Sequence, residues 1–123
     1  MVQTLVGNSP GTTITSGATI PATVISTSIT TIGRPVQVIV TGDANPSSAG
    51  GWCRMQIYRD TTGIGGEVQT EGTGSNENNP FCVQFIDAPT AGTYSYSLKL
   101  NALSGGDFQF GEVTKPVLTV REL

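Results

Sequence analysis

The chain has 123 residues, of which only 12% are charged, and six lysines and arginines against nine aspartates and glutamates give a formal net charge of −3. So few cations, spread along the sequence, argue against nucleic acid as a partner, because its recognition needs many phosphate contacts. Histidine is absent, which excludes a Ser-His-Asp triad, a Cys-His pair and a histidine-containing zinc site. We therefore expect no enzyme activity and no cofactor.

The amino terminus carries a short apolar stretch at residues 2–6, and residues 7–11 (GNSPG) then break regular structure. The segment has no basic region and its apolar stretch is too short for a secretory signal. No other apolar run approaches the roughly twenty residues needed to cross a bilayer. We expect a soluble protein made in the cytoplasm, without a membrane partner.

Short β-branched runs, separated by turns rich in glycine, proline and asparagine, follow one another along the chain. Many short strands at such spacing predict an all-β sandwich or barrel. We expect strands near residues 2–6, 12–15, 22–32, 35–42, 52–59, 66–70, 80–87, 92–101, 107–111 and 113–121.

Several of these segments alternate apolar and polar residues with the period of two that is typical of a half-buried strand. Because one face of each such strand turns inward, the apolar positions predict the core. The expected core residues are Val36, Val38, Val40, Met55, Ile57, Phe81, Val83, Phe85, Tyr94, Tyr96 and Leu98.

The surface is unusually poor in lysine, with Lys99 and Lys115 alone, and residues 23–32 carry no charge. Monomeric sheet proteins usually blunt their edges with charge, especially lysine. The composition therefore indicates that part of the surface is covered in an oligomer or larger assembly. The alternative is a neutral, threonine-rich surface that is simply tolerated.

The two cysteines, Cys53 and Cys82, both fall on expected strands. A bond between them would close a loop of about 30 residues and contribute roughly 3 kcal/mol. The alternative is a pair of small buried thiols in a reducing cytoplasm. Because no export signal is present, we expect free thiols.

Two groups of residues are candidates for ligand binding. Trp52, Tyr58 and Arg59 form a candidate aromatic platform for a sugar ring, although packing at a strand end or a subunit contact is the alternative. Four carboxylates offer oxygen ligands for calcium but lack the spacing of a calcium loop, so we expect no metal site. These are Asp43, Glu77, Asp107 and Glu112.

Four phrases of the sequence, residues 50–60, 78–87, 91–99 and 108–112, occur together with the stretch 29–36 and the ending 120–123. Together they resemble small jelly-roll structural proteins and domains of tailed bacteriophages, and of cyanophages in particular. The resemblance covers the chain from about residue 20 onward. It implies one domain, residues 1–123, that folds as a single antiparallel jelly-roll β-sandwich of eight to ten strands, similar to tumour necrosis factor and complement C1q.

In that group the domain occurs as capsid decoration (cement) proteins and as terminal domains of tail fibres. The resemblance thus implies a non-enzymatic virion structural protein on the capsid exterior, a homotrimer bound to the major capsid protein. It places the trimer interface at residues 22–32 and 113–121. The chain is too short for a fibre shaft, which favours decoration. The alternative is a tail-fibre or spike-associated module that binds a host surface glycan through Trp52 and Tyr58.

Residues 1–19 lie outside the resemblance and are a candidate docking arm. Val2, Leu5 and Val6 offer apolar anchors, and an arm of this kind adds a strand to an exposed edge of a capsid subunit. Several arms on one trimer would gain avidity. The alternative is that residues 2–6 form the first strand of the same sandwich.

Overall fold

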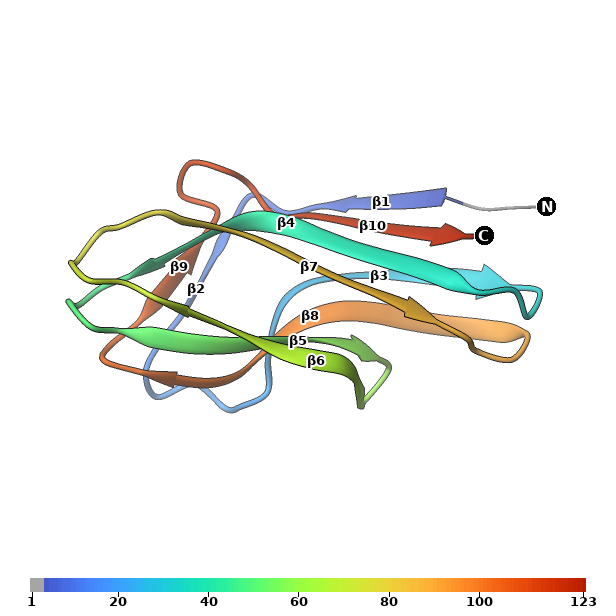
Figure 1. Cartoon of the computed structure of the whole chain (residues 1–123), viewed down its shortest axis with the longest axis horizontal. Helices are drawn as coiled ribbons and strands as arrows, with labels where there is room; N and C mark the ends of the chain where they lie inside the picture. Colours follow the sequence, from blue (N-terminus) through green and yellow to red (C-terminus); the bar gives the residue numbers. More distant parts are fainter. Residues whose placement is uncertain (1–3) are drawn as a thin grey trace.

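A computed structural model describes residues 4–123, which form ten antiparallel strands in two stacked sheets (Figure 1). Sheet A contains β1 (Thr4–Asn8), β2 (Thr12–Ile14), β4 (Val36–Pro46), β7 (Asn79–Asp87), β9 (Phe108–Phe110) and β10 (Val117–Glu122). Sheet B contains β3 (Ala22–Thr31), β5 (Trp52–Arg59), β6 (Thr62–Glu71) and β8 (Gly92–Ser104). The all-β jelly-roll sandwich expected from the sequence is confirmed. Within the described part of the chain, no helix is long and apolar enough to cross a membrane.

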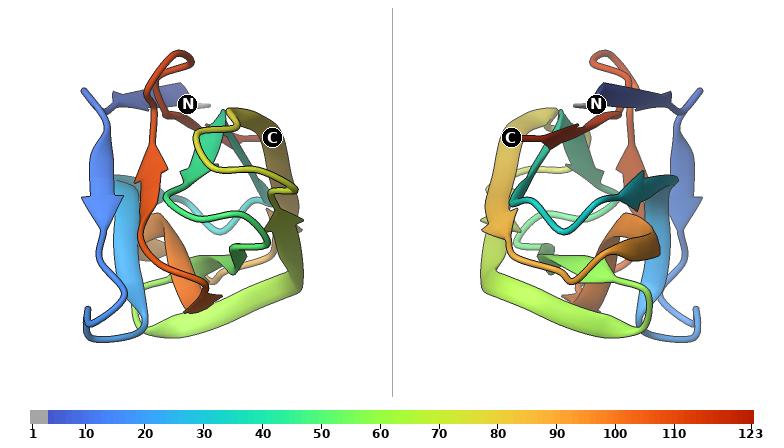
Figure 2. Two further views of the ribbon diagram at one scale, coloured as in Figure 1. Left: turned by 90° about the vertical axis from the view of Figure 1, so that its left-hand side faces the viewer. Right: turned by 90° about the vertical axis from the view of Figure 1, so that its right-hand side faces the viewer.

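The order of the strands explains how distant parts of the sequence meet. In sheet A, β10 and then β9 pair along one edge of β4, while β7 pairs along its other edge. The two short N-terminal strands continue the sheet outward, β1 on β10 and β2 on β9. Sheet B has the order β3-β8-β5-β6. The end views show these two layers facing each other across the core (Figure 2).

The last strand begins later than expected, at residue 117 instead of 113, because residues 111–116 leave the sheet. The buried Asp43 side chain of β4 accepts hydrogen bonds from the backbone N–H groups of Gly111, Glu112, Val113 and Thr114, at 2.8 to 3.1 Å. Because they are bound in this way, these four N–H groups are not available to pair with a neighbouring strand. The carboxylate thus separates β9 from β10.

The N-terminal part of the chain also leaves the sheet, between β1 and β2, and it does so next to Gly111. Gly11, which follows β1, has a φ of 105°, and a Cβ on it would lie 2.7 Å from the carbonyl oxygen of Phe110. Gly111 has a φ of 81°. Only glycine adopts such backbone conformations readily. Both breaks therefore depend on glycine, and they leave β2 and β9 as a short pair at one end of the sandwich.

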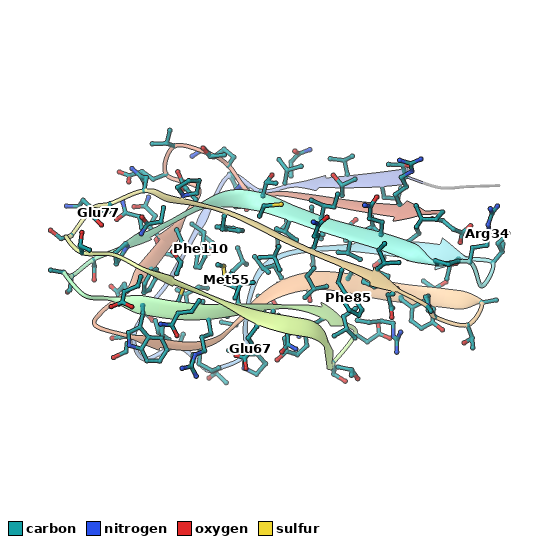
Figure 3. All side chains as sticks on the ribbon, viewed as in Figure 1. Arg34, Met55, Glu67, Glu77, Phe85 and Phe110 are labelled. Carbon is teal, nitrogen blue, oxygen red and sulfur yellow. The ribbon has the colours of Figure 1, made fainter. Side chains whose placement is uncertain are left out.

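The core lies between the two sheets, where Met55 and Phe110 point inward in Figure 3. Nine of the eleven expected core residues are buried. Phe85 and Tyr94 are the exceptions, because both are half-buried at the margin of the core. Phe85 lies where β7 passes close to the outermost strand of sheet B, β6. The Tyr94 hydroxyl contacts Thr90, near the turn between β7 and β8.

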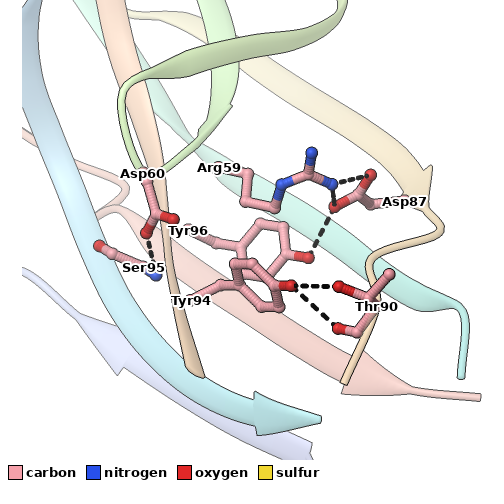
Figure 4. Close-up of polar contacts among 7 residues, drawn as sticks. All are labelled: Arg59, Asp60, Asp87, Thr90, Tyr94, Ser95 and Tyr96. Atoms are coloured by element: carbon pink, nitrogen blue, oxygen red, sulfur yellow. Dashed lines mark hydrogen bonds and ion pairs between the residues drawn. The ribbon is translucent and has the colours of Figure 1, made fainter. Parts of the chain in front are cut away.

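A partly buried ion pair joins the two sheets where β7 ends (Figure 4). Asp87 of β7, which is only 7% exposed, accepts hydrogen bonds from Arg59 of β5 at 2.7 and 2.9 Å and from the hydroxyl of Tyr96 of β8 at 2.7 Å. Burial, and then the bond to Asp87, raise the pKa of Tyr96, so the hydroxyl stays a donor. Next to this pair, Asp60 accepts the backbone N–H of Ser95, which ties the β5–β6 hairpin to β8.

The two cysteines lie in different sheets, and both are free, as expected. Cys53 on β5 faces the core, and burial raises the pKa of its thiol to about 12. Cys82 on β7 faces outward and is exposed. The sequence reasoning placed both on strands but could not assign those strands to separate sheets.

The difference between Phe110 and Phe85 can be measured. We expect Phe110→Ala to lower the free energy of unfolding by about 3–5 kcal/mol, because the ring is fully buried, and Phe85→Ala by about half as much. Urea denaturation of both variants tests this, with far-UV circular dichroism as the control for an intact fold. Equal losses would contradict the assignment of Phe85 to the margin of the core.

The two thiols should differ in reactivity. A thiol reagent added to the folded protein should modify Cys82 and leave Cys53 unmodified, because the thiolate is the reactive form and Cys53 is buried with a raised pKa. Mass spectrometry of the labelled protein identifies the site. After unfolding in denaturant both should react. Modification of Cys53 in the folded protein would disprove this arrangement.

Candidate functional site: the outer faces of the two sheets

The outer side of sheet A presents a wide face that is almost free of charge. Strand register aligns Val6, Thr119, Ile39 and Gln84 in one row across β1, β10, β4 and β7. We call this row and the two beside it the sheet A face. Its members are Thr4, Val6, Asn8, Gln37, Ile39, Thr41, Cys82, Gln84, Ile86, Val117, Thr119 and Arg121.

Arg121 is the one charged residue among these twelve. Val6 and Ile86 are 55% and 58% exposed, which is high for aliphatic side chains. Exposed aliphatic side chains on a face with so little charge are typical of a contact with another protein, because the centres of protein interfaces are depleted in charge. The sequence reasoning missed this face. The sequence does contain a signal for it. On four strands, the residues that alternate with the core positions are almost all uncharged.

The three expected docking residues have different surroundings. Val2 lies outside the described residues. Leu5 turns inward from β1 and packs against the core, so it is a structural residue and not an exposed anchor. Val6 belongs to the sheet A face. Residues 4–8 pair with β10 over their whole length, which is the arrangement of a first strand in the sandwich.

The two regions expected to share an interface lie in different sheets. Residues 22–31 form β3 in sheet B, and residues 117–122 form β10 in sheet A. The outward side chains of β3 are small and hydroxylic, such as Ser26, Ser28 and Thr30. Gly7 of β1 also approaches β3 so closely that a Cβ on it would lie 3.4 Å from Cβ of Thr27. The chain itself therefore covers part of the uncharged edge of β3.

Trp52 and Tyr58 lie on the outer side of β5, where both are half-buried. Each ring has a cation over it. The Arg54 guanidinium lies 5.0 Å from the centre of the Trp52 ring, and the Lys99 ammonium lies 4.9 Å from that of Tyr58. A sugar that stacked on either ring at the same place would have to displace a cation.

Hydrogen bonds link the polar groups around these rings. The Tyr58 hydroxyl donates to Asn101, whose amide nitrogen donates to Gln56 at 2.8 Å. Arg54 donates to the Gln69 side chain at 3.0 Å. This side of sheet B is therefore a polar surface whose donors and acceptors already bind one another.

The four carboxylates considered as calcium ligands do not form a cluster. Asp43, Glu77, Asp107 and Glu112 each accept at least one hydrogen bond from a different part of the protein. Within residues 4–123 no group of three acidic or cysteine side chains is close enough to hold a metal ion. Their roles in this structure are local, since each fixes a loop or a turn.

The sequence matches no family model, and no curated protein is similar to it. Solved structures do share the fold. A chain of infectious bursal disease virus, Gx strain, superposes with a TM-score of 0.60 at 14% identity over 98% of this chain and 31% of that one. The Eiger TNF from S. frugiperda gives 0.57 at 13% identity over 100% and 92%. The EclA C-terminal domain, a sugar-binding protein, gives 0.58 at 12% identity over 91% and 79%.

This chain thus spans about a third of the virus chain and most of the other two. The fold that it shares with them is the jelly-roll sandwich found in viral, TNF-like and sugar-binding proteins. At such low identities the likeness concerns the fold, so the functional argument rests on the surfaces of this chain.

Proposed function

We propose that the chain is a non-enzymatic structural protein of a bacteriophage virion, namely a trimeric capsid decoration protein that binds and stabilises the capsid exterior. The observation that carries this proposal is the sheet A face, in which eleven of twelve side chains are uncharged. The phage resemblance of the sequence and the fold shared with a viral protein support the virion role. The absence of histidine supports a role without catalysis.

The centre of the sheet A face is where the copies meet in this proposal. Ile39 and Thr119 lie side by side on β4 and β10, flanked by Gln84 on β7. Covering these groups with a different surface of a neighbouring copy, as a three-fold ring requires, buries apolar surface without removing a charge from water. Three copies follow from the trimeric packing of the family that the sequence resembles. Closed rotational symmetry then limits the assembly to three copies.

The capsid contact is proposed at the rim of the same face. β1 is the outermost strand on that side of sheet A, and Val6 is its exposed aliphatic residue. Val2, the other exposed anchor expected from the sequence, lies outside the described residues. Leu5 is not part of this contact because it faces the core.

Self-association can be tested by placing a charge at the centre of the face. We expect the wild-type protein to sediment at three times its chain mass of 12.8 kDa. Ile39→Asp should weaken association at least a hundredfold, about 2.7 kcal/mol, because a carboxylate would be buried at the contact. Ser28→Asp, which places the same charge on the exposed side of β3, is the control and should remain trimeric. A monomeric wild type, or a trimeric Ile39→Asp variant, would refute the proposed contact.

Docking on the capsid can be tested separately. Val6→Asp should leave the trimer assembled and reduce binding to undecorated particles at least tenfold, since it charges the rim of the face and not its centre. Cosedimentation with capsids measures the bound fraction, again with Ser28→Asp as the control. If Val6→Asp decorates particles as well as the wild type does, the docking role of β1 is wrong.

A second candidate function is glycan binding, as in a tail-fibre or spike-associated module. It is favoured by Trp52 and Tyr58, which share one outer side of β5 with several amide groups. One of the similar structures is described as a sugar-binding protein and another as the CBM36-1 domain of a multidomain xylanase. A glycan array with the wild type and Trp52→Ala tests this role. A reproducible signal that Trp52→Ala abolishes supports the aromatic platform, and an unchanged signal excludes Trp52 from the site.

A further inference from the structure

A polar groove lies at the end of the sandwich formed by β2 and β9. Two adjoining cavities of about 130 and 190 Å³ share Thr13 and Gln109 in their walls. We call the first cavity, with its opening toward the second, the end groove. Its polar side chains are those of Thr13, Asn45, Ser47, Asn76, Asp107 and Gln109.

The fold fixes these side chains from several directions. Thr13, Gln109 and Asn45 form one row across β2, β9 and β4. Ser47 and Asp107 are tied together by two hydrogen bonds of 2.9 Å, one from the Ser47 N–H to the Asp107 carbonyl and one from the Asp107 N–H to the Ser47 hydroxyl. Walls held in this way lose little entropy when a ligand binds.

Asn45 leaves a hydrogen-bond acceptor unused in the wall of the groove. Its side chain is only 3% exposed, and its amide nitrogen donates to Glu112. Its amide oxygen is buried and has no partner among the described residues. A buried acceptor without a partner destabilises the fold, so a bound group that reached this oxygen after a small movement of the Asn45 side chain would offset that loss.

The lining selects the chemistry of a ligand. It offers amide and hydroxyl groups, which both donate and accept hydrogen bonds, and a single carboxylate, Asp107. Asp107 would repel an anion from the first cavity, although Lys115 lines the second, and a metal ion would find too few charged ligands. The groups that fit are the adjacent hydroxyls of a neutral sugar. The first cavity, of about 130 Å³, has the volume of roughly four water molecules, so a sugar ring would also extend into the adjoining cavity of about 190 Å³.

The end groove differs from the aromatic platform at Gln109, although its Asn45, Ser47 and Asp107 are also hydrogen-bonded within the protein. At Trp52 and Tyr58 the rings are covered by cations and the neighbouring amides bind each other. In the groove, the Gln109 side chain is exposed and has no hydrogen bond to another described side chain. We infer that the end groove is a binding site for a neutral saccharide. This inference rests on the second candidate function and moves its site away from Trp52.

The experiment compares a groove variant with an exposed control variant of the same chain. An array of neutral glycans is probed first, and free glucose, galactose and N-acetylglucosamine are then titrated while amide signals are followed by NMR. We expect shifts at the groove residues, including the side-chain amides of Asn76 and Gln109, and at least tenfold weaker binding by Gln109→Ala. Ser28→Ala, at an exposed position of β3 outside the groove and the sheet A face, should bind like the wild type.

The outcomes separate the inference from the function on which it rests. Binding that is lost in Trp52→Ala and kept in Gln109→Ala would leave glycan binding intact and overturn the groove as its site. An empty array together with unshifted amide signals for all three sugars would overturn both. Trimer formation by the wild type bears on neither result, because it is measured without sugar.

Discussion

The Asp43 carboxylate is the interaction on which the layout of sheet A depends. It receives four backbone N–H groups from residues 111–114, and a carboxylate can accept about four hydrogen bonds. Its acceptor capacity is therefore filled within the protein, although the side chain is only 2% exposed. By holding this loop out of the sheet, it divides one long strand into β9 and β10. The flat, charge-poor face lies over β10, and the polar end groove lies over β9.

Much of the small charge of this protein is used inside the fold. Asp87 binds Arg59 and Tyr96 between the sheets, and Glu122 is fully buried beside the β3–β4 turn. The Thr31 hydroxyl, and then the N–H of Ile32, lower the pKa of Glu122, so it remains ionised there. Because a low total of charges is partly consumed in this way, large areas of the outer surface are left neutral. A sheet face with so little charge has a weak defence against association, which is why we interpret it as a contact surface.

The sequence predicts burial well where the pattern within a single strand determines which side chains face the core. Alternation at residues 36–40 identifies Val36, Val38 and Val40 as core residues, and all three are buried. It fails where a distant residue intervenes, as for the strand expected at 113–121, whose start is displaced by Asp43 about seventy positions earlier. The shared side of Trp52 and Tyr58 follows from their even spacing, but the cation over Tyr58 comes from another strand. Alternation also does not reveal which strands pair, so the sequence could not show that residues 22–31 and 117–122 belong to different sheets.

The division of sheet A allows assembly and ligand binding to occur on one small protein without competition. Residues 111–116 stand out as a loop between β9 and β10 (Figure 2). The rows that contain Ile39 and Val6 lie on the β10 side of this loop, whereas Thr13 and Gln109 lie on the β9 side. A neighbouring copy seated on the sheet A face therefore has no need to cover the end groove. Because Asp43 anchors the loop through backbone groups, the exposed side chains of Val113 and Thr114 can vary without joining the two surfaces.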